Sequence, residues 1–443
     1  MRLHFQAALV AIALAFAAPS IGFAQDTMPP ATEAAPAPEM VETPAPAPAE
    51  AAPFDADAAT DAYVGQLTGE AKEKSDAYFE GGYVLDAVDV LYTIVVAAIL
   101  LFFRISTRMR DFAQRWTRVR FIHSIVYVVQ FVLVMAVLTF PYTVYRDFLR
   151  EHEYGLSNQD FPEWGGEFLI GLGVDVILLS VFIAILYAIV ARVGPRWWMW
   201  GTAASIVFLA FVVLISPVYI SPLFNDYTPL EDGPIKERIL GLAHANGIAT
   251  DDVYRFDASK QSKRISANVS GLAGTMRISL NDNLLNRGTP EEIAAVMAHE
   301  IGHYVLNHIY EMMAWMTIML FVAFAFVNWA FGGLVGVFGE RWRVAGIADP
   351  AGLPLAIALF TVFFWVITPV WNTMIRSNEA EADIFGLNAA READGFASVA
   401  MKLSEYRKID PEPWEEFVFY DHPSGRSRVS MAMHWKAENL ETK

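Results

Sequence analysis

The sequence predicts an α-helical multi-pass membrane protein with a smaller α+β domain built on the extensions of its transmembrane helices. Three observations lead to this fold class. Apolar residues make up 55% of the 443 residues and gather in long blocks. A segment of short β-rich runs, residues 253–282, interrupts these blocks. The pentad HEIGH follows that segment, and its two histidines are spaced for one face of a helix.

The first 24 residues carry Arg2, then an apolar run, then small residues that end at Ala24. This pattern is typical of a secretory signal that is cleaved after Ala24. The alternative is an uncleaved first span over residues 5–23. Residues 25–80 begin with a stretch of alanine, proline and acid, and we expect a disordered tether there because large apolar groups are scarce.

Six further apolar blocks follow, and each is near the ~20 residues that a helix needs to cross hydrocarbon. They lie at residues 84–103, 121–141, 168–191, 197–217, 311–331 and 353–372. We therefore expect a four-span region over 81–217 and a two-span hairpin over 311–372. Residues 218–310 and 373–443 would form the catalytic regions outside the bilayer.

Arginines are unevenly shared between the loops, which predicts the orientation. The first loop, residues 104–120, holds six arginines, and the third and fifth loops hold two each. The second loop has Arg146 and Arg150 among five acids. Loops one, three and five are therefore expected in the cytoplasm, and residues 218–310 and the C-terminal region on the exported side.

Net charge and the lack of cysteine exclude some classes of function. The net charge of −17 argues against nucleic acid as a partner. Without cysteine there is no thiolate metal site. A bound zinc ion would therefore need histidine and carboxylate ligands.

The segment NRGTPEEIAAVMAHEIGHY predicts the helix that carries the pentad. Thr289 fits its N-cap and Glu292 the reciprocal position of a capping box. His299 and His303 are four residues apart, so one helical face presents both to a tetrahedral zinc ion. Glu300 lies beside them, where it can take a proton from an attacking water.

A third ligand is expected in EAEAD, just past the last apolar block. His303 lies before the fifth block, and Glu379 lies after the sixth. At a helical rise of ~1.5 Å per residue, both are about 11–12 Å beyond the apolar edge. Two spans separate them, so they emerge on the same side. Asp383, one turn on, is expected to support a ligand histidine. Glu381 is expected to be solvated, and His308 to lie off the metal face at the membrane interface.

Three motifs in order, HEIGH, EAEAD and HPSGRSR, resemble the HExxH, ExxxD and HP[ST]xxxR motifs of a family of membrane zinc metalloendopeptidases. That family comprises the type I CAAX prenyl proteases and the HtpX-like proteases. Segments 215–243 and 274–285 are similar to the prenyl-protease branch. The resemblance covers about residues 80–435 and implies a bacterial homologue in the cell membrane, with a zincin-like catalytic domain. Relatives in that branch have seven spans, which this chain reaches only if residues 5–23 are retained.

The resemblance implies one zinc ion per chain on the pentad histidines and Glu379, with the pentad glutamate as general base. Asp383 would support a ligand or donate a proton. His422 would help to stabilise the oxyanion, although taken alone it is a loop histidine. Arg428 would hold the active-site wall or the C-terminal side of the substrate.

The β-rich segment predicts a small sheet whose edge lies beside the zinc helix. An extended substrate could add to that edge through backbone hydrogen bonds. Ser266 and Asn268 lie where relatives keep a substrate strand, so both are candidates for substrate binding. The other interpretation of the two residues is purely structural.

These features favour a zinc endopeptidase that cuts peptides or membrane-associated proteins. One alternative is an intramembrane protease with its zinc at bilayer depth. The polarity of the zinc helix argues against it, because so many polar groups would be unfavourable in lipid. Another is a metal transporter or a non-catalytic zinc-binding scaffold, which would need the ligands but no general base such as Glu300. Prenylated CAAX tails and misfolded membrane proteins both remain open as substrates.

Overall fold

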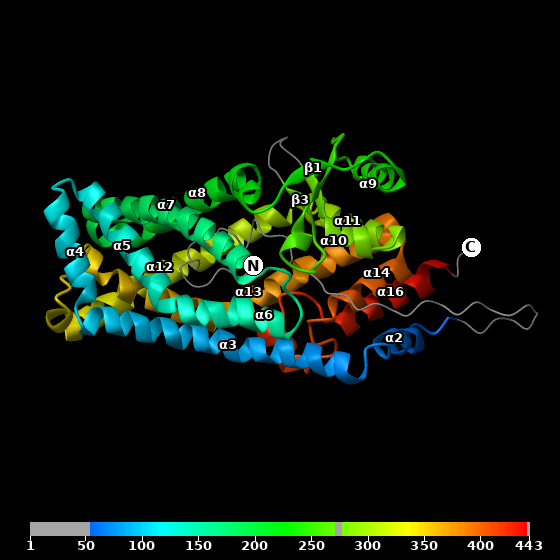
Figure 1. Cartoon of the computed structure of the whole chain (residues 1–443), viewed down its shortest axis with the longest axis horizontal. Helices are drawn as coiled ribbons and strands as arrows, with labels where there is room; N and C mark the ends of the chain where they lie inside the picture. The colour runs from blue at the N-terminus through cyan, green and yellow to red at the C-terminus, as the bar shows by residue number, and fades with distance from the viewer. Residues whose placement is uncertain (1–53, 271–276, 441–443) are drawn as a thin grey trace, which may run out of the picture.

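The computed structural model describes residues 54–270 and 277–440. Long helices run along its greatest dimension, and a small sheet with shorter helices lies towards one end (Figure 1). The long helices are α3 (Gly69–Phe102), α5 (Arg120–Val144), α7 (Phe161–Val193), α8 (Trp197–Ile215), α12 (His308–Trp342) and α13 (Leu353–Ala390). The expected signal at residues 1–24 and the possible span at 5–23 lie outside the described residues.

By length and composition, five helical runs in the described residues could cross a membrane, and the longest spans residues 161–223. That run contains α7 and α8, joined by the short turn Gly194–Arg196. The rings of Phe182 in α7 and Phe208 in α8 stack with centroids 4.2 Å apart, so the run folds back on itself. The five runs thus carry all six predicted apolar blocks, and the expected multi-pass helical fold is confirmed.

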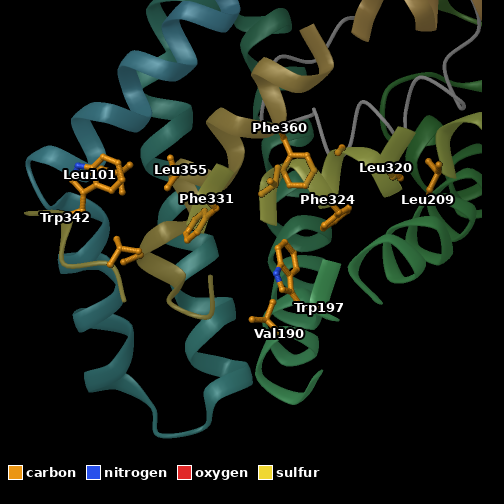
Figure 2. Packing of buried hydrophobic residues seen from close by; sticks show 14 of the residues in the cluster. Leu101, Val190, Trp197, Leu209, Leu320, Phe324, Phe331, Trp342, Leu355 and Phe360 are labelled. Carbon is orange, nitrogen blue, oxygen red and sulfur yellow. The ribbon is translucent and has the colours of Figure 1, made fainter. Parts of the chain in front are cut away.

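Large apolar side chains from several long helices fill the centre of the bundle (Figure 2). Phe324 of α12 lies edge-on to Trp197 of α8 and Phe360 of α13, with ring centroids 5.6 and 5.0 Å apart. Helix α8 can approach this ring because residue 201 is glycine, where a Cβ would lie 3.0 Å from Phe324. Because lipid tails are as apolar as these side chains, the hydrophobic effect does not drive their association inside a bilayer. Close van der Waals packing stabilises the contact instead.

The arginine-rich loops gather at the end of the molecule far from the sheet. Helix α4 (Ile105–Trp116) lies there, at the left of Figure 1. Nε of Arg104 donates a hydrogen bond to the backbone oxygen of Arg341 at 2.9 Å. Arg110 forms an ion pair with Asp349 at 2.7 Å. The first and fifth loops therefore meet at one end, as the predicted orientation requires.

The sheet has four strands in the order β1-β2-β4-β3, so β3 lies at an edge. The pair β2 and β4 is parallel, whereas the other two pairs are antiparallel. Fully buried side chains of β4, such as Ile278 and Leu280, pack in one cluster with Met297 of the pentad helix. The strands are β1 (Tyr227–Pro229), β2 (Val253–Phe256), β3 (Ala267–Ser270) and β4 (Arg277–Asn281).

Short helices surround the sheet and the pentad. They are α6 (Arg150–Glu153), α9 (Pro234–Ala245), α10 (Asp282–Arg287), α11 (Pro290–Val305), α14 (Ala393–Leu403), α15 (Pro413–Phe419) and α16 (Gly425–Leu440). Helix α11 carries the pentad and begins with the predicted capping box between Thr289 and Glu292. Glu292 also accepts a hydrogen bond from Lys402 at 2.6 Å, which fastens α14 to the start of α11.

The pentad helix is not a direct extension of a span, contrary to the prediction. Helix α11 ends at Val305, and α12 begins at His308. Between them Asn307 has φ +61°, in the left-handed region, which interrupts the helical hydrogen-bond ladder. Helix α13, in contrast, continues from the bundle past Glu379 to Ala390. The prediction therefore holds for the third ligand and is wrong for the histidines.

The expected disordered tether is also wrong over its last part. Within residues 56–80 the chain forms α2 (Ala56–Val64) and the first turns of α3. Ala56 and Thr60 are buried, and Asp61 forms an ion pair with Arg426 of α16 at 2.7 Å. Packing against α16, which lies far along the sequence, therefore stabilises this helix despite its alanine-rich composition.

Candidate metal centre

Three predicted ligands meet where α13 crosses α11. Nε2 of His299 lies 3.3 Å from Oε2 of Glu379, and Nε2 of His303 lies 3.4 Å from Oε1. The two Nε2 atoms are 3.1 Å apart. Ligand atoms ~2.0–2.1 Å from a tetrahedral ion lie roughly 3.3 Å from one another, so the spacing suits one metal ion. Gly386 allows the close crossing, because a Cβ there would lie 3.1 Å from the backbone nitrogen of His299.

A buried ion pair supports the first ligand. Nδ1 of His299 lies 2.8 Å from Oδ1 of Asp383, and Nε of Arg428 donates to Oδ2 of Asp383 at 2.8 Å. Burial alone would lower the pKa of His299, but the contacts with Asp383 and Glu379 outweigh it and raise the pKa to about 10. Because Nδ1 is committed to Asp383, Nε2 of His299 is left to face the metal.

His308 contacts the second candidate ligand, which the sequence did not predict. It is only 2% exposed, and its Nδ1 lies 2.9 Å from Nδ1 of His303. Its Nε2 faces Oε2 of Glu381 at 3.5 Å, and the Glu381 side chain is 60% exposed, as expected. The prediction counted positions along one helix, whereas the break at Asn307 turns His308 back towards His303.

Two further predicted residues face the same point. Glu300 lines the pocket beside the histidines, and burial raises the pKa of its carboxyl although the histidines oppose this. His422, in the loop before α16, places Nδ1 2.8 Å from Asp421 and Nε2 3.3 Å from Oε2 of Glu379. Among the described residues, these last two atoms, Nε2 and Oε2, are buried without a hydrogen-bond partner.

The orphaned atoms test whether the site fits a metal. A buried polar atom without a partner costs about 1–3 kcal/mol. A cation placed among the ligand atoms of His299, His303 and Glu379, which all lie within 4.8 Å of one another, would satisfy the carboxylate and both imidazoles together. The residues present therefore fit a metal ion.

Comparison with known families decides the assignment. The model of peptidase family M48 matches residues 229–436. A second model, the five membrane helices of the CAAX prenyl protease N-terminal region, matches residues 56–226. The chain belongs to peptidase family M48. It is a multi-pass membrane metalloprotease, and the alternative of a metal transporter or scaffold is not favoured.

Individual relatives of this M48 protein agree with the family models. It is 27% identical to the uncharacterized metalloprotease YhfN of Bacillus subtilis over 75% of this chain and 79% of the relative. It is also 27% identical to a CAAX prenyl protease 1 homolog of Oryza sativa, over 83% and 88%. The crystal structure of S. mikatae Ste24p shares the fold, with a TM-score of 0.69, 20% identity, and coverage of 85% of this chain and 94% of that one.

A pocket of this metalloprotease opens beside the candidate metal ligands. Ser266 and Ala267 form part of its wall, at the start of edge strand β3. The hydroxyl of Ser266 is buried without a hydrogen-bond partner among the described residues. Asn268, the other predicted substrate residue, is not part of the pocket wall.

The structure thus brings most predicted site residues of the M48 protein together and adds two. Arg428 lines the pocket but is committed to Asp383 by two hydrogen bonds. His308 was missed, although an asparagine just before it is a signal for a helix end. Arg407, which also lines the pocket, follows α14 and has no motif around it that would identify it.

Proposed function

We propose that this chain is a zinc endopeptidase in which His299, His303 and Glu379 bind one zinc ion. The observation that carries the proposal is the ligand triangle with 3.1–3.4 Å edges beside a glutamate in the same pocket. A set of two imidazoles and one carboxylate is a usual ligand set for catalytic zinc, which keeps a fourth position open. Zinc, when bound, polarises the scissile carbonyl and activates water.

The protein's own groups would handle the proton and the developing charge. The carboxylate of Glu300 forms no hydrogen bond with a described residue, and its raised pKa favours taking a proton from water and returning it to the leaving amine. His422, whose Nδ1 lies 2.8 Å from Asp421, would donate a hydrogen bond from Nε2 to the carbonyl oxygen as that oxygen becomes anionic. One such donor contributes roughly 3–4 kcal/mol to transition-state stabilisation. Arg428 would act through Asp383 by fixing His299.

Zinc content and peptide cleavage should be measured together on purified wild type, Glu300→Gln and Glu379→Ala. We expect Glu300→Gln to keep zinc and lose roughly 10²–10⁴-fold in kcat. Glu379→Ala should lose zinc. Glu291→Gln, an exposed glutamate on the same helix, is the matched control and should behave as wild type. Full activity of Glu300→Gln, or wild type that binds zinc and cleaves no peptide, would contradict the proposal.

The substrate is proposed to be a peptide or protein held at the membrane. Two relatives are named CAAX prenyl protease 1, from Saccharomyces cerevisiae and, as a homolog, Oryza sativa, which supports testing prenylated tails. Matched peptides with and without a farnesyl group give the test. A preference for the farnesylated peptide would support prenyl recognition, whereas equal cleavage would favour general turnover of membrane-associated proteins.

The metal centre is proposed to face the exported side of a bacterial-type inner membrane. The arginine-rich loops at the opposite end of the structure support this orientation. Because the chain has no cysteine, single cysteines at exposed positions can be labelled selectively. In intact cells a membrane-impermeant maleimide should label Asp232→Cys and not Arg118→Cys, and the reverse pattern would overturn the orientation.

A further inference from the structure

The pocket beside the metal centre has a mixed lining. Glu300, His422 and Arg428 supply polar groups. Helices α14 and α11 supply apolar side chains, among them Phe396, Val399, Leu403 and Val296. Arg407, on the segment that follows α14, adds a guanidinium to this lining. The pocket thus combines an apolar surface with a cation that is not one of the groups of the metal centre.

Arg407 differs from the basic side chains around it because it has no hydrogen-bond or ion-pair partner among the described residues. It forms no hydrogen bond, ion pair or ring contact with any residue that the structure describes. Its basic neighbours are all paired with carboxylates: Arg428 with Asp383, Lys402 with Glu292, Lys408 with Glu415 and Arg287 with Glu405. The described structure therefore leaves one cation in the pocket wall without a counter-charge.

The chemistry of this cation selects its ligand. An arginine is always charged, and its planar guanidinium matches a carboxylate with two parallel hydrogen bonds. Arg407 is half-buried beside apolar side chains, where an ion pair is screened less than on an open surface. A doubly charged phosphate would also meet the carboxylates of Glu300 and Glu379 in the same pocket. A singly charged carboxylate suits the site better.

We propose that Arg407 forms a carboxylate-binding subsite, which makes the enzyme select substrates that carry a carboxylate near the scissile bond. This inference rests on the proposed function, because the pocket holds a substrate only if the metal centre cleaves one. The carboxylate can come from an Asp or Glu side chain or from a free C-terminus, and both present the same group to the guanidinium. Arg407 is a specificity-determining residue in this proposal and takes no part in the bond cleavage.

Quenched-fluorescent octapeptides of Ala and Leu test the subsite. Each peptide carries one Glu, or Gln in its place, and is made as a free acid and as a C-terminal amide. A charge-assisted hydrogen bond contributes roughly 1.5–3 kcal/mol. At one position of the peptide, wild type should therefore prefer the carboxylate over its neutral counterpart by about 10- to 100-fold in kcat/KM. A preference for Glu over Gln shows that the subsite binds a side-chain carboxylate. A preference that is lost on C-terminal amidation shows that it binds the free C-terminus.

Substitution of Arg407 then decides whether the guanidinium is responsible. In Arg407→Gln the ratio between charged and neutral peptides should fall to near one, and in Arg407→Glu it should invert. Arg426→Gln, a more exposed arginine outside the pocket wall, should keep the wild-type ratio. A preference that survives in Arg407→Gln, or a wild type with no preference, would overturn the subsite.

A binding measurement separates failure of the subsite from failure of the proposed function. Fluorescein-labelled versions of the same peptides are titrated against Glu300→Gln and against the double variant Glu300→Gln/Arg407→Gln. If the carboxylate peptides bind more tightly and this gain requires Arg407, the subsite is supported, whether or not wild type cleaves them. If wild type cleaves no peptide, the proposed function fails. Cleavage by wild type without any charge-dependent binding would retain the function and reject the subsite.

Discussion

The two ligand histidines lie one turn apart on the same helix, yet their supports differ. His299 is supported by Asp383, which is fully buried and paired with Arg428. Residues of α11, α13 and α16 therefore meet at the imidazole of His299. Behind His303 stands His308, the first residue of the next helix, followed by an exposed Glu381. The first support lies in the core of the domain. The second depends on the backbone conformation at Asn307, where α11 and α12 are separated.

The metal site is therefore held more firmly at His299 than at His303. Removing one member of a buried ion pair leaves a buried charge, which is strongly destabilising. Removing an outer partner at a half-exposed ligand affects the metal more than the fold. We therefore expect the two histidines to respond to substitution behind them in different measurable quantities.

The largest effect is expected from Asp383→Ala. Arg428 would be left buried without its partner, so the free energy of unfolding should fall by roughly 3–5 kcal/mol, and bound zinc should be lost. Thermal or denaturant unfolding and metal analysis measure the two effects. The double variant Asp383→Ala/Arg428→Met should recover stability but not zinc; recovery of zinc would show that Asp383 acts only through the ion pair.

A smaller effect is expected from His308→Ala. Without an acceptor for the Nδ1 proton of His303, zinc affinity should fall by roughly 10- to 100-fold, with little change in the unfolding midpoint. Competition with a chromophoric chelator measures the affinity. His308→Gln retains an acceptor oxygen and should recover part of the loss. Equal affinity in His308→Ala and wild type would show that His303 needs no partner.

The break itself is tested by Asn307→Ala. A left-handed conformation costs roughly 1–2 kcal/mol in residues other than glycine, less for asparagine, so Asn307→Ala should lower stability by ~1 kcal/mol. Asn307→Gly should not, because glycine adopts this conformation freely. Unfolding in detergent micelles compares the two variants. Equal stability of both variants would mean that the left-handed residue does not define the break.

The smallest effect is expected from Glu381→Gln. Its carboxylate is 60% exposed and lies 3.5 Å from His308, and exposed ion pairs contribute little. Zinc affinity should fall by no more than about threefold. The same chelator competition measures it. A loss as large as that of His308→Ala would show that the charge of Glu381, and not the ring of His308, supports the second ligand.

The sequence predicted the parts of the site that depend on spacing within one helix. The capping box of Thr289, the i,i+4 histidines and the distance of Glu379 beyond its span each follow from regular helix geometry. The break at Asn307 did not follow, because one asparagine between two helical patterns is a weak signal. Helix α2 did not follow either, because the residues of α16 that stabilise it lie far away in sequence.

Helix α13 connects the metal to the lipid, whereas α11 does not. Helix α13 runs as one continuous helix from the bundle past Glu379, with Pro369 inside it. Helix α11 is held by the sheet and separated from α12 by Asn307. Spans adjust their tilt to the thickness of the surrounding bilayer. A change in the tilt of α13 in a thinner or thicker bilayer would therefore act directly on Glu379, and on the two histidines only through contacts such as the close approach at Gly386.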